Sequence, residues 1–135
     1  MKRVFVDVNV FLRFFTEDDA GQHTCAAKLF RAAAEGGIAL LVGPPVLFEV
    51  AWTLRAAYAR TPVQVADVLE AILSLPGLSL TDASVCTKAL RLARDSGVEF
   101  PDAYIAALAE TCGADAVATF NLADFRRLGS RCHTL

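Results

Sequence analysis

Short apolar runs alternate with longer segments of helical spacing along the chain. The apolar runs predict strands at 3–9, 38–42, 78–81 and 116–119, and the tail predicts a further edge strand. Helical spacing and start and stop signals predict helices at 20–37, 45–60, 61–77, 82–96 and 101–112, and a loop with a short helix at 121–129. Because strands alternate with helices, the pattern predicts a three-layer α/β/α fold with a mostly parallel central sheet.

The predicted helix at 61–77 has the clearest boundaries. Thr61 is a good N-cap, Pro62 suits the first helical position, and Gln64 completes a capping box. Pro76 and Gly77 end the segment.

The first predicted strand is interrupted by two polar residues. Asp7 and Asn9 lie within "VFVDVNVFLRFF", residues 4–15, although both are poor strand formers and costly in a core. We expect the surrounding apolar side chains to form a central strand buried on both faces: Val4, Phe5, Val6, Val8, Val10 and Phe11. Alternation along a strand would point Asp7 and Asn9 the same way, so that Asn9 could orient the carboxylate or a metal-bound water.

Four acidic residues are predicted to meet at one edge of the sheet. Asp7 lies near the end of the first strand, Glu49 and Asp102 lie near the starts of helices, and Asp124 follows the last clear strand. Strand ends and the starts of the following helices share one edge of an open parallel sheet. Two carboxylates about 4 Å apart repel by about 4 kcal/mol at an effective dielectric near 20, so protons or a cation must offset the charge. Oxygen-only donors suit Mg²⁺ or Mn²⁺.

Each of these acids also has a structural interpretation when it is considered alone. Asp102 after a proline is a common helix-start residue, Asp124 could cap a short helix, and Glu49 could lie on a solvated face. Asp7 is the hardest to explain without a function.

Composition limits the remaining possibilities. The chain has 135 residues, 55% of them hydrophobic, which predicts one domain spanning residues 1–135. The net charge of −2 argues against a uniformly basic nucleic-acid surface, but not against a local basic rim. No apolar run is long enough to span a membrane, and Asp7 interrupts the segment that resembles a signal peptide. The four cysteines form no CxxC pair, so we expect free thiols in a reducing cytoplasm.

Four motifs in order resemble those of the PIN domain, and in particular the small single-domain nucleases of the VapC toxin type. The motifs are "FVDVNVFLRFF", "PPVLFEVAWTL", "FPDAYIAALAETCGAD" and "AVATFNLADF". The resemblance covers nearly the whole chain. It implies a metal-dependent endoribonuclease that is the toxin of a type II toxin–antitoxin pair.

The resemblance also implies roles for individual residues. Asp7, Glu49, Asp102 and Asp124 would hold one or two Mg²⁺ or Mn²⁺ ions. Asn9 and Thr119 match positions that shape the site, and Asn121 matches a polar position that is Asp in some members. Either Asp124 or a water held by Asn121 would therefore supply the fourth ligand.

Substrate and partner contacts are less specific in the sequence. Arg13, Arg126 and Arg127 flank the first and last motifs and are candidates for RNA phosphate contacts. Phe14, Phe15 and Phe120 could stack on bases or pack in the core. Family members pair with an antitoxin that blocks the site and commonly form homodimers, for which we consider Trp52, Leu54 and Tyr58 as an apolar interface.

Two other functions compete with the nuclease. A haloacid dehalogenase-like phosphatase would need an acid two residues after Asp7, where Asn9 cannot deliver a proton. A PIN-like module that binds RNA or protein without catalysis is the other alternative. His23 and His133 lie outside the strand-end motifs, which disfavours histidine-based RNase chemistry.

Overall fold

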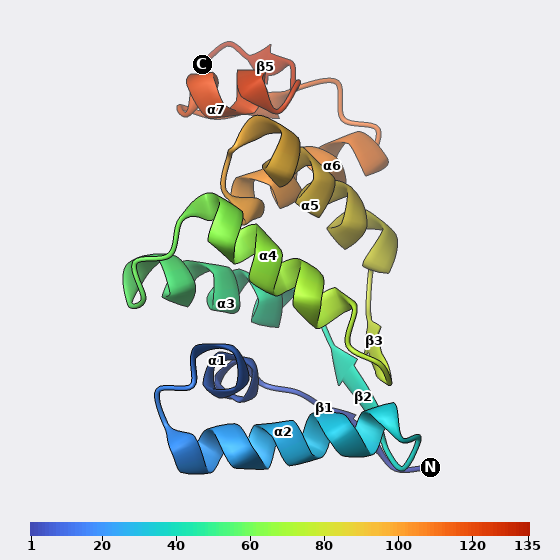
Figure 1. Ribbon diagram of the computed structural model, residues 1–135. Helices are drawn as coiled ribbons and strands as arrows, with labels where there is room; N and C mark the ends of the chain where they lie inside the picture. The colour runs from blue at the N-terminus through green and yellow to red at the C-terminus, as the bar shows by residue number, and fades with distance from the viewer.

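The computed structural model describes residues 1–135 as a mixed α/β chain with seven helices and five strands. The helices are α1 (Val8–Thr16), α2 (Ala20–Ala34), α3 (Pro44–Ala56), α4 (Pro62–Leu73), α5 (Ala83–Ser96), α6 (Phe100–Thr111) and α7 (Leu122–Arg127). The strands are β1 (Arg3–Phe5), β2 (Ala39–Val42), β3 (Leu78–Leu80), β4 (Val117–Ala118) and β5 (Cys132–His133). Helix pairs α1–α2, α3–α4 and α5–α6 follow one another from the N-terminal to the C-terminal end of the molecule (Figure 1).

Every strand pairing is parallel, as predicted. β2 lies between β1 and β3, with Leu40 opposite Val4 on one side and Leu78 on the other. β4 and β5 form a second, two-stranded sheet in which Val117 is opposite Cys132. The edge strand predicted in the tail is therefore β5.

Two groups of apolar side chains form the core. The larger group joins β2 to side chains of α1 to α6, and Leu40, Val42 and Leu47 are fully buried in it. Helices thus pack around the three-stranded sheet, consistent with the predicted three-layer fold. The smaller group joins α5, α6 and α7, where Ala103 and Phe125 are buried.

All four cysteines are free thiols, and burial raises the pKa of the Cys86 thiol to about 11. None of the helices has the length and apolar character that crossing a membrane requires.

The prediction for residues 3–9 is wrong beyond Phe5. β1 has only three residues, Phe5 is 58% exposed, and α1 begins at Val8. Asp7 is the exposed N-cap residue of α1 and Asn9 lies within its first turn, so the two side chains do not alternate along a strand. The polar pair interrupts the apolar run because the chain turns there from strand to helix, not because a buried strand carries a carboxylate.

A helical period was present in that segment. Val8, Phe11, Leu12 and Phe15 fall at positions i, i+3, i+4 and i+7, and Phe11 and Leu12 are buried. The β-branched residues favoured a strand locally, and packing of this apolar face overrides that preference.

The residues that cap the start of α4 were predicted more accurately. Thr61 and Gln64 form the predicted capping box, with Gln64 N donating to Thr61 Oγ1 at 3.2 Å and Thr61 N donating to Gln64 Oε1 at 2.9 Å. α4 nevertheless ends at Leu73, before the proline and glycine. Asp82 begins the segment predicted as the helix at 82–96, where its residue type is expected to cap the helix. That expectation is wrong: Asp82 occupies the N-cap position of α5 but has φ 54° and makes no side-chain capping hydrogen bond.

Leu54→Ala is expected to lower the free energy of unfolding by about 2–5 kcal/mol, because the Leu54 side chain is only 1% exposed and its loss leaves a cavity. Chemical denaturation measures this change. Val63→Ala is the control: Val63 is 58% exposed, so its substitution should change the free energy of unfolding by no more than about 0.5 kcal/mol. Equal effects of the two substitutions would contradict the placement of Leu54 in the core.

Candidate active site

The side-chain amide of Asn121 lies between two of the predicted acids. Its Nδ2 donates to Asp124 Oδ2 at 2.9 Å and to Asp102 Oδ2 at 3.3 Å. Asp102 comes from the first turn of α6 and Asp124 from the first turn of α7. Asn121 N in turn donates to Thr119 Oγ1 at 3.0 Å, which fixes the loop between β4 and α7. Four residues singled out in the sequence therefore form one polar cluster.

The electrostatics of this cluster disfavour charge on Asp102. Partial burial raises the pKa of the Asp102 carboxyl, and the negative charges of Asp124 and Glu99 raise it further. The hydrogen bond from Asn121 acts in the opposite direction but does not reverse the shift. The helix dipole at the start of α6 also favours an anion, but burial remains the largest influence on this carboxyl and its pKa stays raised.

The predicted basic residues lie on the same short helix as Asp124. Arg127 Nη1 is 3.7 Å from Asp124 Oδ1, and the Arg127 guanidinium also donates to the carbonyl oxygen of Ser96 at the end of α5. Arg127 thus joins α7 to α5 while it remains about half exposed, and Arg126 beside it is exposed. Both arginines are close in sequence to the acidic cluster, as the last motif suggested.

The other two predicted acids lie outside this cluster. Asp7 is exposed before α1, and Glu49 is exposed on α3, where it lines a hollow with Phe48, Trp52 and Pro101. No three His, Cys, Asp or Glu side chains lie close enough together to hold a metal ion. The hydrogen bonds of Asn121 bring Asp102 and Asp124 together, and neither Asp7 nor Glu49 is hydrogen-bonded to this cluster. Asn9 is exposed on α1.

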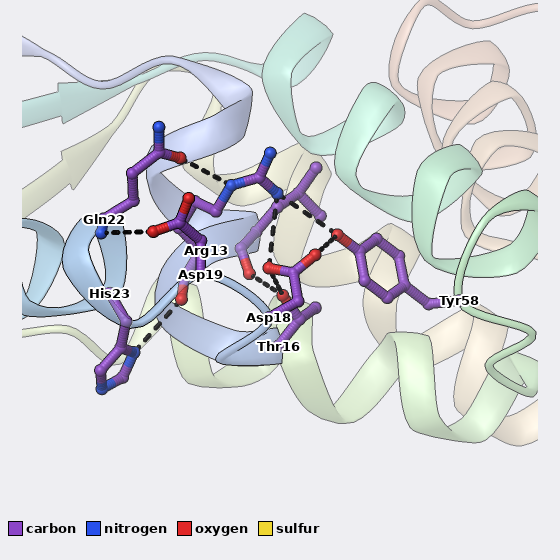
Figure 2. Close-up of polar contacts among 8 residues, drawn as sticks. Arg13, Thr16, Asp18, Asp19, Gln22, His23 and Tyr58 are labelled. Atoms are coloured by element: carbon purple, nitrogen blue, oxygen red, sulfur yellow. Dashed lines mark hydrogen bonds and ion pairs between the residues drawn. The ribbon is translucent and has the colours of Figure 1, made fainter.

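Arg13, a predicted phosphate contact, belongs to a separate polar network (Figure 2). Its Nε donates to Gln22 Oε1 at 2.7 Å, and its Nη1 lies 3.5 Å from Asp18 Oδ1 and 3.4 Å from Tyr58 Oη. Tyr58 Oη donates to Asp18 Oδ2 at 2.6 Å. These contacts join the end of α1 and the start of α2 to the chain after α3. The Arg13 guanidinium is thus already engaged within the protein.

Hydrogen bonding lowers the pKa of Asp18 in this network. The largest cause is the hydrogen bond from Tyr58, and Thr16 and the charge of Arg13 act in the same direction. His23 lies beside the network, with Nδ1 3.2 Å from the Arg13 carbonyl oxygen and Nε2 3.3 Å from Glu17. The sequence showed no motif for this network, because its members are joined only by the packing of α1, α2 and α3.

The predicted aromatic and apolar contacts separate into buried and exposed groups. Phe14 packs edge-on against Phe15 and Phe30, which favours the core interpretation of Phe14 and Phe15. Phe120 is 92% exposed beside Thr119. Of the three residues considered for an apolar interface, Leu54 is buried in the core and Tyr58 binds Asp18, so only Trp52 is available.

The donors of the cluster suit a hard divalent cation. Asp102 and Asp124 present carboxylate oxygens, and their mutual repulsion is the kind that a cation offsets. The absence of sulfur and imidazole donors among the predicted ligands disfavours a zinc site.

Comparison with known proteins identifies the family. The profile described as the PIN domain matches residues 4–130 of the chain. A search of curated proteins found no match.

Asp102→Asn is expected to raise the melting temperature at pH 7 in the presence of a chelator. The folded protein holds the pKa of Asp102 above its ordinary value of 3.8, so ionisation of this carboxyl destabilises the fold as pH rises through the folded pKa. The difference between variant and wild type should disappear below pH 3.8, where the carboxyl is protonated in both states. Differential scanning calorimetry across pH measures it, and a variant that melts lower at pH 7 would contradict the assignment.

Tyr58→Phe is expected to raise the pKa of Asp18 toward its ordinary value, because the largest cause of the lowered pKa is the Tyr58 hydroxyl. The lowered pKa stabilises the fold above the unfolded value and this contribution is lost as pH falls, so the variant should also lose less stability in acid. NMR titration of the Asp18 carboxyl measures the shift. Tyr104→Phe is the control and should leave the pKa of Asp18 unchanged, because Tyr104 packs against Phe48 and Phe100 and does not contact Asp18.

Proposed function

This chain belongs to the PIN domain family, a nuclease-type fold, and on that premise we propose that it is a metal-dependent endoribonuclease that hydrolyses RNA phosphodiester bonds. We further propose that it is the toxin of a type II toxin–antitoxin pair. The observation that carries the proposal is the pair of carboxylates, Asp102 and Asp124, held on the side-chain amide of Asn121.

The proposed ligands of Mg²⁺ or Mn²⁺ are Asp102 and Asp124, with Asp7 and Glu49 completing the set. A bound divalent cation supplies Lewis-acid activation of water and offsets charge on the phosphate. Asn121 keeps the two carboxylates oriented, and Thr119 keeps Asn121 in place. Burial and the charge of Asp124 raise the pKa of Asp102, so a cation bound there would offset a disfavoured negative charge.

The basic residues of α7 support an RNA substrate. Arg126 is exposed and Arg127 is half exposed, so both guanidiniums are accessible to a phosphate near Asp124. Arginine binds phosphate with two parallel hydrogen bonds, which positions the chain without reading its sequence. Arg13 remains a weaker candidate, because its guanidinium already contacts Gln22, Asp18 and Tyr58.

Two alternative functions remain, a haloacid dehalogenase-like phosphatase and a non-catalytic module. A phosphatase of the haloacid dehalogenase type lacks its acid at Asn9, and Asn9 lies on a helix rather than beside Asp7 on a strand. The other alternative is a non-catalytic PIN-like module that binds RNA or protein. It predicts RNA binding without cleavage.

A toxin role adds a protein partner to the proposal. The partner would be an antitoxin that covers the acids with a cationic side chain, and we also propose a homodimer. Induced expression of the wild-type chain should then arrest growth, and co-expression of the neighbouring reading frame should restore it.

Asp102→Asn and Asp7→Asn are each expected to reduce cleavage of a structured RNA by roughly 100-fold or more in Mg²⁺ or Mn²⁺, because each removes a proposed cation ligand. Gel analysis of the RNA products with and without EDTA measures this. Asp7 makes no capping hydrogen bond, so the Asp7 variant should keep the wild-type fold by circular dichroism.

Asp95→Asn is the matched control, since Asp95 is an exposed carboxylate on α5 and should leave cleavage unchanged. Cleavage that persists in EDTA, or in both ligand variants, would contradict the proposal. Hydrolysis of p-nitrophenyl phosphate without RNA cleavage would favour the phosphatase instead.

A further inference from the structure

Trp52 is the only tryptophan of the chain and its indole is 69% exposed. It lies on α3 three residues after Glu49, so the two side chains share one face of the helix. Leaving so large an apolar side chain in water is unfavourable. An exposed indole beside a predicted catalytic acid therefore needs an explanation.

The indole forms one wall of a hollow between α3 and the start of α6. The hollow has a volume of about 480 Å³ and is lined by Phe48, Glu49, Trp52, Thr53 and Pro101. Its size falls within the roughly 300–1,000 Å³ typical of small-ligand sites. Pro101, which lines the hollow, is the residue before Asp102 of the acidic cluster in the chain. Glu49 lines the same hollow.

The walls of this hollow are held in place by packing and by an ion pair. The Phe48 ring packs edge-on against Tyr104, with ring centroids 4.9 Å apart, and lies 5.8 Å from Phe100. On the other side of Trp52, Arg55 Nε lies 2.6 Å from Glu99 Oε1 and joins α3 to the N-cap of α6. These contacts join α3, which carries Trp52, to the start of α6, which carries Pro101.

We propose that Trp52 stacks on a nucleobase of a single-stranded RNA substrate, which enters the hollow beside Glu49. This inference rests on the proposed nuclease function and adds a base subsite to it. Single-stranded RNA is bound by stacking of its bases on aromatic side chains, and stacking tolerates any base because every base has a π-face. The Thr53 hydroxyl, which can donate or accept a hydrogen bond, lies in the same lining and suits this tolerance.

A second copy of the chain explains the hollow less well. An isologous interface over Trp52 would bring Glu49 of both copies out of water, and a buried carboxylate without a partner is costly. A stacked base leaves the edge of the hollow open, so Glu49 stays hydrated or bound to a cation.

The sole tryptophan allows a direct test. A single-stranded RNA oligonucleotide is titrated into the full chain in EDTA, which prevents the proposed metal-dependent cleavage, while Trp52 fluorescence is recorded, and labelled-oligonucleotide anisotropy measures Kd independently. We expect saturable quenching with the same Kd in both measurements. Trp52→Ala should raise Kd by roughly 5- to 100-fold, whereas Trp52→Phe, which keeps an aromatic ring, should stay closer to wild type.

Val63→Ala is the matched control for the loss of an exposed apolar side chain and should leave Kd unchanged. Full binding without any change in fluorescence, or a wild-type Kd for Trp52→Ala, overturns the inference. So does a Trp52→Ala variant that changes only the oligomeric state by analytical ultracentrifugation, since this result assigns the indole to a second copy.

Cleavage of RNA separates this inference from the proposed function. If wild type cuts RNA and Trp52→Ala cuts and binds it equally well, the subsite is wrong and the nuclease stands. If wild type quenches on binding but cuts no RNA in Mg²⁺ or Mn²⁺, the nuclease is wrong and the stacking site stands.

Discussion

The burial of β2 between two parallel neighbours is the constraint on which the rest of the structure depends. Leu40 and Val42 are fully buried, and both edges of the strand are occupied by β1 and β3. A strand with neighbours on both edges and buried side chains tolerates only apolar residues. The chain leaves β2 through Gly43 and enters α3 at once at Pro44, which fixes where Glu49 and Trp52 lie relative to the sheet. The position of the hollow beside Trp52 therefore follows from the packing of one strand.

Local signals predicted the elements whose ends are defined by specific residues. The capping box at Thr61, the apolar strand at β2 and the start of α6 near Pro101 depend on neighbours a few residues away, and they were placed well. The segment after Phe5 was misassigned because valine favours strands in isolation, whereas the apolar face that includes Phe11 and Leu12 is buried only when α1 packs against α2 and α3. α4 was predicted too long because proline and glycine mark where a helix must stop, not where it does.

The candidate site was predicted in part for a similar reason. Asp102 and Asp124 were expected at one place, and the structure joins them through Asn121. The central position of Asn121 was not anticipated, since it depends on the distance between the starts of two helices. The residues next to Arg13 and Arg126 in the sequence do not show that Arg13 belongs to a polar network whereas Arg126 is exposed. The difference depends on Tyr58, which lies 45 residues along the chain from Arg13. The meeting of Asp7 and Glu49 with the other acids remains a prediction.

The identity of residue 121 has a consequence for how the acidic cluster keeps its shape. An asparagine amide donates hydrogen bonds at neutral charge, so it can hold Asp102 and Asp124 in place in a chain that has no ion bound. An aspartate at the same position would have no proton to donate at neutral pH and would add a third negative charge. The two carboxylates would then lose the donor that joins them, and only the backbone hydrogen bond from residue 121 to Thr119 would remain in this loop. With asparagine, the cluster is assembled in advance, so the cation proposed to bind there would need little rearrangement of the two carboxylates.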